Sequence, residues 1–183
     1  MRATILARRD AIPESQRLSR SLAMSQKVLA LPEFGAAKVV MAYMSMGSEI
    51  DTQAIVGAIL ERGSQLALPR VDRTAKMLAL HGVRDLQRDL KPGIWGIREP
   101  DPVHCQTVPL SRVDFILMPG AVFDRQRHRL GYGGGFYDKL LALPGRHAIT
   151  VAVAFEEQLV PEVPMEPHDF SVDILVSDHD LYR

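Results

Sequence analysis

RLGYGGGFYDKLL, residues 129–141, is the segment from which the rest of the chain can be placed. An apolar segment, VDFILMPG (113–120), precedes it, and YDKLLAL (137–143) follows it with helical spacing. This order predicts a buried strand, a long loop, a glycine turn and a helix. In an α/β protein that is where a nucleotide or another phosphate is usually held. The glycines of the turn are Gly131, Gly133, Gly134 and Gly135.

The glycine turn is suited to an anion, although it matches neither of the common phosphate motifs. Glycine carries no Cβ, so a run of glycines can adopt positive φ and bring backbone N–H groups close to a ligand. A P-loop needs Lys-Ser or Lys-Thr after the glycines, and a dinucleotide motif begun at Gly131 would need glycine at Phe136. An ordinary flexible turn is the alternative. Arg129, Tyr137 and Asp138 beside the turn favour a site.

Length and composition bound the class of protein. The 183 residues fit one domain, 1–183, and a hydrophobic content of 46% is ample for a single core. Lys+Arg and Asp+Glu are both 22, so no net field attracts nucleic acid or a membrane surface. The one cysteine, Cys105, excludes an internal disulfide and suits a reducing compartment. No apolar run reaches the ~20 residues of a membrane span, and the N-terminus has no secretory signal, so we expect a cytoplasmic protein.

The order of apolar segments predicts a mainly parallel sheet. Residues 1–31 are expected to form helices broken near Pro13, and a helix is expected to begin after Thr52 as N-cap and to end at Gly63. Strand, helix and strand within about 35 residues predict a βαβ unit. The proline-containing segment 89–111 is expected to be an extended connection. The expected strands are KVVMAYM (38–44), QLALPRV (65–71), MLALHGV (77–83), VDFILMP (113–119), AITVAVAF (148–155) and, as the last, VDILVS (172–177).

Three polar loops could meet at the carboxyl edge of this sheet, where doubly wound proteins bind ligands. They are SMGSEID (45–51), the glycine turn and FEEQLVPEVPMEPHD (155–169). Glu49 could hold the N–H groups of a polar ligand, or could be an acid favoured near a helix start by the macrodipole. Asp138, Asp169 and Asp173 are candidates for Mg²⁺, which takes one or two carboxylates besides phosphate oxygens. Asp169 and Asp173 could equally be loop and strand-end acids.

Two basic clusters allow more than one interpretation. Arg2, Arg8 and Arg9 form either a solvated face or partners of a phosphate. The run RQRHR (125–129) is interpreted as a phosphate-facing loop rather than an RNA-binding segment, because no aromatic residues interleave with it.

The sequence offers no motif for a zinc site or for a protein nucleophile. His104 and Cys105 have no second pair of ligands at zinc spacing, and no nucleophile motif is present.

With these residues placed, the chain resembles the 5-formyltetrahydrofolate cyclo-ligases, also called 5,10-methenyltetrahydrofolate synthetases, over nearly its whole length. The most specific part is MPGAVFDRQRHRLGYGGGFYDKLL (118–141), which is similar to the ATP and folate loop of that family. YMSMGSEIDT (43–52), GIREP (96–100) and PHDFSVD (167–173) are similar to its folate-contacting loop, its middle signature and its acidic C-terminal signature.

The resemblance implies a three-layer α/β/α domain with a mainly parallel, Rossmann-like sheet, and an ATP- and Mg²⁺-dependent ring closure. ATP would phosphorylate the formyl oxygen of 5-formyltetrahydrofolate to give an iminium phosphate. Attack by N10 and loss of phosphate would then leave 5,10-methenyltetrahydrofolate. Phosphoryl transfer is mostly positioning and charge neutralisation, so no protein nucleophile is needed. The expected partner is the small-molecule folate, with no nucleic acid and no membrane, and the expected state is a monomer.

The resemblance also implies roles for individual residues. Arg129 and Tyr137 would act in catalysis, and Asp138 and Asp169 would hold Mg²⁺. The ATP contacts would be Arg2, Arg129, Leu130, Gly131, Tyr132, Gly133, Gly134, Gly135, Phe136 and Tyr137. The substrate contacts would be Met44, Glu49, Tyr132, Gly133, Gly134, Gly135 and Phe136.

Two other functions stay open on the sequence. The same fold could carry a phosphosugar- or CoA-type site without ATP chemistry, which nucleotide binding with and without Mg²⁺ would separate. It could also be a non-catalytic module that binds nucleotide, folate or RNA, for which ligand binding without phosphate release would be the sign.

Overall fold

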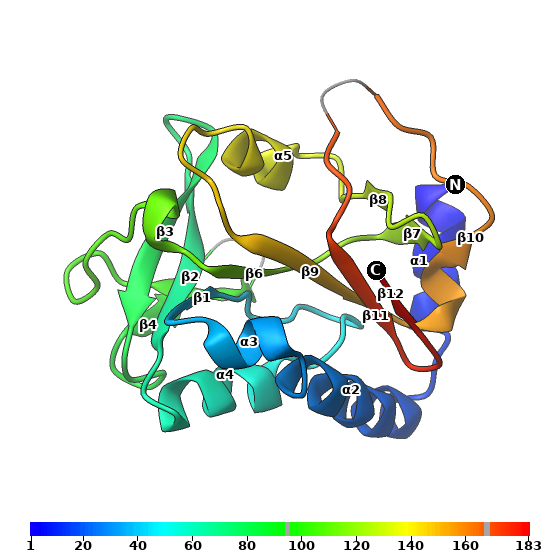
Figure 1. Cartoon of the computed structure of the whole chain (residues 1–183), viewed down its shortest axis with the longest axis horizontal. Coiled ribbons are helices and arrows are strands. Elements are labelled where there is room, and N and C mark those ends of the chain that lie inside the picture. Colours follow the sequence, from blue (N-terminus) through cyan, green and yellow to red (C-terminus); the bar gives the residue numbers. More distant parts are fainter. Residues whose placement is uncertain (94–95, 167–168) are drawn as a thin grey trace.

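A seven-stranded sheet runs through the computed structural model of the chain, which describes residues 1–93, 96–166 and 169–183 (Figure 1). Its strands pair in the order β12-β11-β9-β6-β1-β2-β3. The pairs from β11 to β2 are parallel, whereas β3 and β12 are antiparallel edge strands. The bounds are β1 (Val39–Met41), β2 (Gln65–Asp72), β3 (Met77–Val83), β6 (Phe115–Met118), β9 (Ile149–Ala154), β11 (Ile174–Ser177) and β12 (Leu181–Tyr182). The mainly parallel sheet is confirmed.

Helices cover both faces of the sheet, as a three-layer α/β/α arrangement requires. Figure 1 shows α2 (Glu14–Leu29), α3 (Pro32–Ala36) and α4 (Gln53–Glu61) together on one face. On the other face lies α5 (Phe136–Leu141), a single short helix, and α1 (Arg2–Asp10) stands at the side. The break near Pro13 between α1 and α2 is confirmed. No helix among the described residues is long and apolar enough to cross a membrane.

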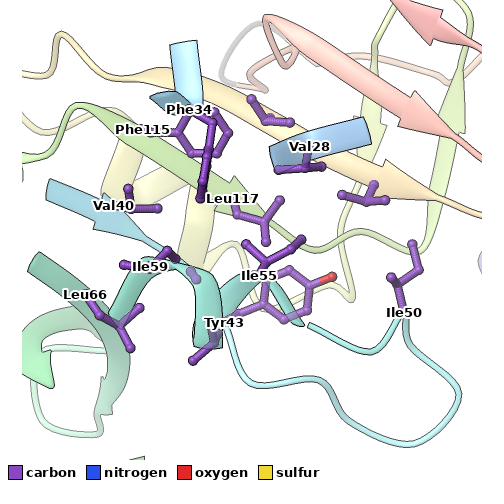
Figure 2. Packing of buried hydrophobic residues seen from close by; sticks show 14 of the residues in the cluster. Val28, Phe34, Val40, Tyr43, Ile50, Ile55, Ile59, Leu66, Phe115 and Leu117 are labelled. Carbon is purple, nitrogen blue, oxygen red and sulfur yellow. The ribbon is translucent and has the colours of Figure 1, made fainter. Parts of the chain in front are cut away.

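The main hydrophobic core lies between the sheet and the layer of α2, α3 and α4 (Figure 2). Phe34 of α3 packs edge-on against Phe115 of β6, with ring centroids 5.5 Å apart and an interplanar angle of 85°. Ile55 and Ile59 of α4 are fully buried, one turn apart on one helical face. A second cluster on the opposite face holds Leu140 of α5. Because strands β1 and β6 are buried on both faces, their sequences are apolar runs rather than alternating ones.

The βαβ unit of β1, α4 and β2 forms as predicted, but Thr52 does not cap α4 with its side chain. Its hydroxyl donates instead to the carbonyl of Tyr43 at 2.7 Å, which ties the helix start to the loop after β1. Asp51 Oδ1 accepts from the backbone N–H of Gln53 at 2.9 Å. At the other end, Gly63 adopts φ +77° just after the helix, as its role at the helix end requires.

Two small sheets correct the predicted order of elements. Within 89–111, β4 (Leu90–Pro92) pairs antiparallel with β5 (Arg98–Pro100), so this segment is not a simple extended connection. Between β6 and the glycine turn, β7 (Val122–Asp124) pairs with β8 (Arg129–Leu130) and with β10 (Leu159–Val160). VDILVS is not the last strand, because β12 follows it. These strands have only two or three residues each, too few for a hydrophobic period to reveal them.

Candidate functional site

A cavity of about 470 Å³ opens where β1 and β6 end, which is the edge that the sequence predicted. Its volume lies within the range of small-molecule sites. Two of the three predicted loops line it, the loop after β1 and the glycine turn. None of the described residues of 155–169 lines it. The lining is Tyr43, Met44, Met46, Glu49, Leu68, Pro69, Val71, Leu78, Ile97, Arg98, Glu99, Pro119, Arg129, Gly131, Tyr132, Gly134, Gly135, Phe136, Tyr137 and Asp138.

The glycine turn, residues 131–135, has a backbone that other residues would not adopt freely. Gly133 and Gly135 have φ of +102° and +63°, in the left-handed region. A Cβ on Gly134 would lie 2.7 Å from the ring of Phe136. Gly135 directly precedes α5, so the turn delivers bare backbone to the start of a helix as predicted.

Arg129 is a buried cation on the cavity wall. Only 4% of it is exposed. Its Nη2 donates to Asp138 Oδ1 at 2.7 Å, and its guanidinium carbon lies 5.9 Å from the ring centre of Tyr137. Its Nε has no hydrogen-bond partner among the described residues. Among the described residues the carboxylate of Asp138 alone is paired with this cation, and part of its donor capacity remains for an anionic ligand.

Helix α1 brings two further arginines to the glycine turn. Arg2 Nε donates to the carbonyl of Gly131 at 2.7 Å. Arg9 is buried, which corrects the interpretation of the N-terminal cluster as a wholly solvated face. Only Arg8, between them, is exposed. The sequence held one signal for this, an apolar residue, Ile5, one helical turn before Arg9, and the structure buries both.

Glu49 faces the glycine turn across the cavity. Its Oε1 accepts from the Tyr132 hydroxyl at 2.6 Å, and its Oε2 accepts from the backbone N–H of Met46 at 2.8 Å. Because α4 begins only at Gln53, Glu49 does not lie in the first turn of that helix. Burial raises the pKa of the Glu49 carboxyl, and these two hydrogen bonds offset part of the rise. The interpretation of Glu49 as a ligand-facing carboxylate fits this geometry better than a helix-end role.

Three tyrosines around the cavity are held in their protonated form. Burial raises the pKa of Tyr43, Tyr132 and Tyr137 well above the usual phenol value, and the nearby Glu49 charge adds to the rise in each case. At neutral pH these hydroxyls are therefore hydrogen-bond donors rather than bases. If Tyr137 acts in catalysis, its protonated hydroxyl can do so by donating a hydrogen bond, not by accepting a proton as a base.

The far wall of the cavity consists of residues that sequence reasoning did not name individually. Leu68 of β2 and Leu78 of β3 make it apolar, and Arg98 and Glu99 of β5 add charge. Glu99 is 8% exposed and packs so closely on Gly93 that a Cβ there would lie 2.4 Å from its Cγ. For the charged part of this wall, the signal in the sequence was the segment GIREP (96–100), which resembles a family signature.

The predicted acids are placed differently from one another. Asp138 lines the cavity, whereas Asp169 precedes β11, where its Oδ2 accepts from the N–H of Glu166 at 2.8 Å. Asp169 is not among the described residues of the lining; its neighbours Pro167 and His168, the first two residues of PHDFSVD, lie outside the described residues. No cluster of three or more potential metal ligands occurs in the described ranges.

Two further predicted groups lie wholly or mostly outside the described lining of the cavity. Asp173 Oδ2 accepts from the N–H and the hydroxyl of Thr150, both at 2.8 Å, which joins the start of β9 to β11. In the basic run 125–129, Arg129 alone is among the described residues that line the cavity, while Arg125 is exposed. The phosphate-facing interpretation of this run therefore narrows to Arg129.

Comparisons with known proteins agree with one another. The model of the 5-formyltetrahydrofolate cyclo-ligase family matches residues 1–178. The chain is 31% identical to the 5-formyltetrahydrofolate cyclo-ligase of Mus musculus, over 94% of this chain and 89% of the relative. It is 32% identical to that of Mycolicibacterium smegmatis, with the same coverage. The NMR structure of Aquifex aeolicus 5,10-methenyltetrahydrofolate synthetase superposes with a TM-score of 0.86 and 32% identity, over 100% of this chain and 90% of that one.

Proposed function

The chain belongs to the 5-formyltetrahydrofolate cyclo-ligase family, and from this we infer that its cavity converts 5-formyltetrahydrofolate to 5,10-methenyltetrahydrofolate with ATP. The observation that carries the inference is the pairing of the glycine turn with Glu49 across one cavity. If a phosphoryl group is to pass from ATP to the folate, the backbone that binds phosphate and the polar group that binds the folate must line the same cavity. The reaction makes the protein a ligase of one-carbon metabolism.

We propose that the glycine turn and two arginines hold ATP. Bare backbone at Gly133, Gly134 and Gly135 allows phosphate oxygens to approach N–H groups closely. Arg129 lies beside the turn with a donor that has no partner among the described residues, and Arg2 lies against Gly131. Charge neutralisation of this kind, together with positioning, is what phosphoryl transfer needs from a protein.

We propose that Asp138 contributes to a Mg²⁺ site, with Asp169 as the second acid. The donor set at the cavity fits Mg²⁺, because this ion binds through one or two carboxylates and otherwise uses phosphate oxygens and waters. When bound, Mg²⁺ would neutralise charge on the phosphates. Asp138 is already oriented toward the cavity by its bond to Arg129.

We propose that the folate occupies the space between Glu49, Met44 and the apolar wall of β2 and β3. Flat apolar rings suit the surface of Leu68 and Leu78, and Glu49 offers a carboxylate to N–H groups at the edge of the ring system. The protonated Tyr137 hydroxyl, on the same wall as Arg129, would donate a hydrogen bond to oxygen at the reacting centre.

The chemistry follows from these positions. The formyl oxygen attacks the γ-phosphorus of ATP, and the bond to ADP breaks. N10 then attacks the activated carbon, the carbon–oxygen bond breaks, phosphate leaves with the former formyl oxygen, and N10 loses its proton. The net products are the methenyl folate, ADP and phosphate. Throughout these steps the positive charge of Arg129 would stabilise the negative charge on the transferred phosphoryl group.

Turnover of the purified protein tests this function. With 5-formyltetrahydrofolate, ATP and Mg²⁺ together, the near-ultraviolet absorbance of the methenyl product should rise, and omission of ATP should abolish the rise. Binding of both ligands by a folded protein without product would contradict the proposal. That the chain acts as one domain, as a monomer and in the cytoplasm stays a prediction.

A further inference from the structure

Arg9 of α1 connects the two loops that face each other across the cavity. Its Nη1 donates to the Tyr132 hydroxyl at 2.6 Å, and its Nε donates to Ser48 Oγ at 2.9 Å. Tyr132 belongs to the glycine turn, whereas Ser48 belongs to the loop after β1 that also carries Glu49. The Arg9 side chain is buried, yet it is not among the described residues that line the cavity. It reaches the cavity only through the residues that it holds.

The chemistry of the guanidinium fixes the direction of every hydrogen bond around it. Arginine has only donors, so the Tyr132 oxygen must accept from Arg9. The single phenolic proton is then directed at Glu49 Oε1, 2.6 Å away. In the same way, Ser48 Oγ accepts from Arg9 and donates to Asp10. One cation therefore orients both hydroxyls, and with them the carboxylate of Glu49.

Helix α1 is a firm support for this arrangement. Ile5, one turn before Arg9 on the same face, packs against Ala121, Val122 and Val163. The guanidinium of Arg9 also lies 5.8 Å from the ring centre of Tyr132, within the range of a cation–π contact. Side chains held by packing and by hydrogen bonds of this kind keep the groups of a binding site in one geometry.

We propose that Arg9 is a positioning residue of the folate half of the site, which fixes Tyr132 and Glu49 in the arrangement that receives the substrate. The identity of the ligand rests on the proposed function, whereas the network of hydrogen bonds does not. Residues 130–137 contain no lysine or arginine, so the cation that holds the tip of the turn comes from α1. The exposed Tyr132 ring reaches the opposite loop through its hydroxyl, which Arg9 polarises.

A double-mutant cycle tests this role. Arg9→Gln and Tyr132→Phe should each raise the KM for 5-formyltetrahydrofolate about tenfold and change kcat less, because each loses a hydrogen bond to a charged group. The double variant should be no worse than either single variant, since both changes remove the same connection. Arg9→Lys should raise the KM less than Arg9→Gln does. The lysine ammonium can donate to Tyr132 or to Ser48, whereas the guanidinium of Arg9 donates to both. Arg8→Gln, on the exposed neighbour, is the matched control.

An unchanged KM in Arg9→Gln, or effects that multiply in the double variant, would overturn the proposal. If Arg9→Gln fails to fold, Tyr132→Phe still tests the proposal, because Tyr132 is 40% exposed and phenylalanine keeps the packing of the ring. Hydrogen–deuterium exchange of the free protein gives a readout that needs no turnover. Peptides covering 43–50 and 129–137 should exchange faster in Arg9→Gln than in Arg8→Gln, and equal exchange would contradict the connection. Absence of turnover in the wild type would refute the proposed function while leaving this result to stand or fall separately.

Discussion

Arg129 and Asp138 illustrate how one ion pair links stability of the fold to charge at the site. The Arg129 side chain is 2% exposed and that of Asp138 is 19% exposed, so loss of the acid would leave a buried cation without its counter-charge. An asparagine keeps an oxygen that can accept from Arg129 Nη2 but removes the negative charge. One substitution can therefore test both the ion pair of Asp138 with Arg129 and the proposed contribution of Asp138 to a Mg²⁺ site.

Asp138→Asn should raise the Mg²⁺ concentration needed for half-maximal turnover about tenfold or more, because the site loses a carboxylate ligand. Its unfolding free energy should fall by about 2–3 kcal/mol, because Arg129 keeps a hydrogen bond but loses its counter-charge. Magnesium titrations of turnover and thermal unfolding measure the two effects. Glu61→Gln, on the exposed end of α4, is the control for loss of one negative charge. An unchanged magnesium dependence would remove Asp138 from the metal role.

Glu49 carries a pH dependence of stability that its substitution should expose. Its pKa in the folded protein is raised above the ordinary value of 4.5, chiefly by burial, so the folded state favours the protonated carboxyl more than the unfolded state does. Its contribution to stability is then fully present below about pH 4 and is lost as the pH rises through the raised pKa.

Denaturant unfolding at several pH values measures this effect in Glu49→Gln. Since glutamine does not titrate, the difference in unfolding free energy should shift in favour of the variant between about pH 4 and pH 7. The same variant should bind the folate more weakly, because the carboxylate is lost. A difference that stays constant with pH would show that the environment of Glu49 does not disfavour its charge.

At the residue scale, the sequence predicted the site residues that belong to a recognisable motif. It did not predict the residues whose role depends on burial in the folded chain. The glycine turn and Glu49 were predicted, and the structure brings them to one cavity. Arg2, Arg8 and Arg9 were left between a solvated face and phosphate partners, because the sequence does not show what the face of α1 that carries Ile5 and Arg9 packs against. Asp173 was a candidate ligand, yet it joins two strands through Thr150. Its sequence position at a strand start is the same in either role.

At the scale of elements, the glycine turn depends on backbone that only glycine adopts without strain. Gly133→Val should weaken ATP binding at least about tenfold, since a branched Cβ at φ +102° strains the turn and blocks approach to its N–H groups. Gly63→Val is the matched control: Gly63 also has positive φ, +77°, and a Cβ there meets nothing within 4 Å. The control should lose stability without loss of ATP affinity in calorimetric titrations. Normal ATP affinity in Gly133→Val would contradict the phosphate role of the turn.

The elements predicted well are those with enough residues to show a period. Strands β2 and β3 match their predicted ranges almost to the residue, because each has seven or eight residues bounded by polar turns. The small strands β7, β8 and β10 have two or three residues and were missed. Prolines in 89–111 suggested an irregular connection, although Pro92 and Pro100 end the short paired strands β4 and β5. This pair supplies part of the far wall of the cavity, so the prediction of the site was incomplete for the same reason.

At the scale of the whole molecule, the ends of the parallel strands position the site, and the sheet itself is stabilised by the helices α2, α3 and α4 packed on one of its faces. The core under α2, α3 and α4 lies on the side away from α5 (Figure 1, Figure 2). Substitutions of core residues that do not line the cavity should therefore change stability before they change chemistry, whereas the cavity is lined by loop residues and by parts of β2, β3, β5, β8 and α5. The mainly parallel sheet followed from the order of apolar segments, but the contact of α1 with the glycine turn is a tertiary contact that no local pattern encodes.

The stoichiometry of turnover is the most direct test of the central claim. Purified protein mixed with 5-formyltetrahydrofolate, ATP and Mg²⁺ should form methenyl product, followed by its near-ultraviolet absorbance, together with one ADP for each product molecule. Neither ADP nor product should appear when the folate is omitted. Release of ADP without product, or product without ATP, would contradict a ring closure driven by phosphorylation of the formyl oxygen in this cavity.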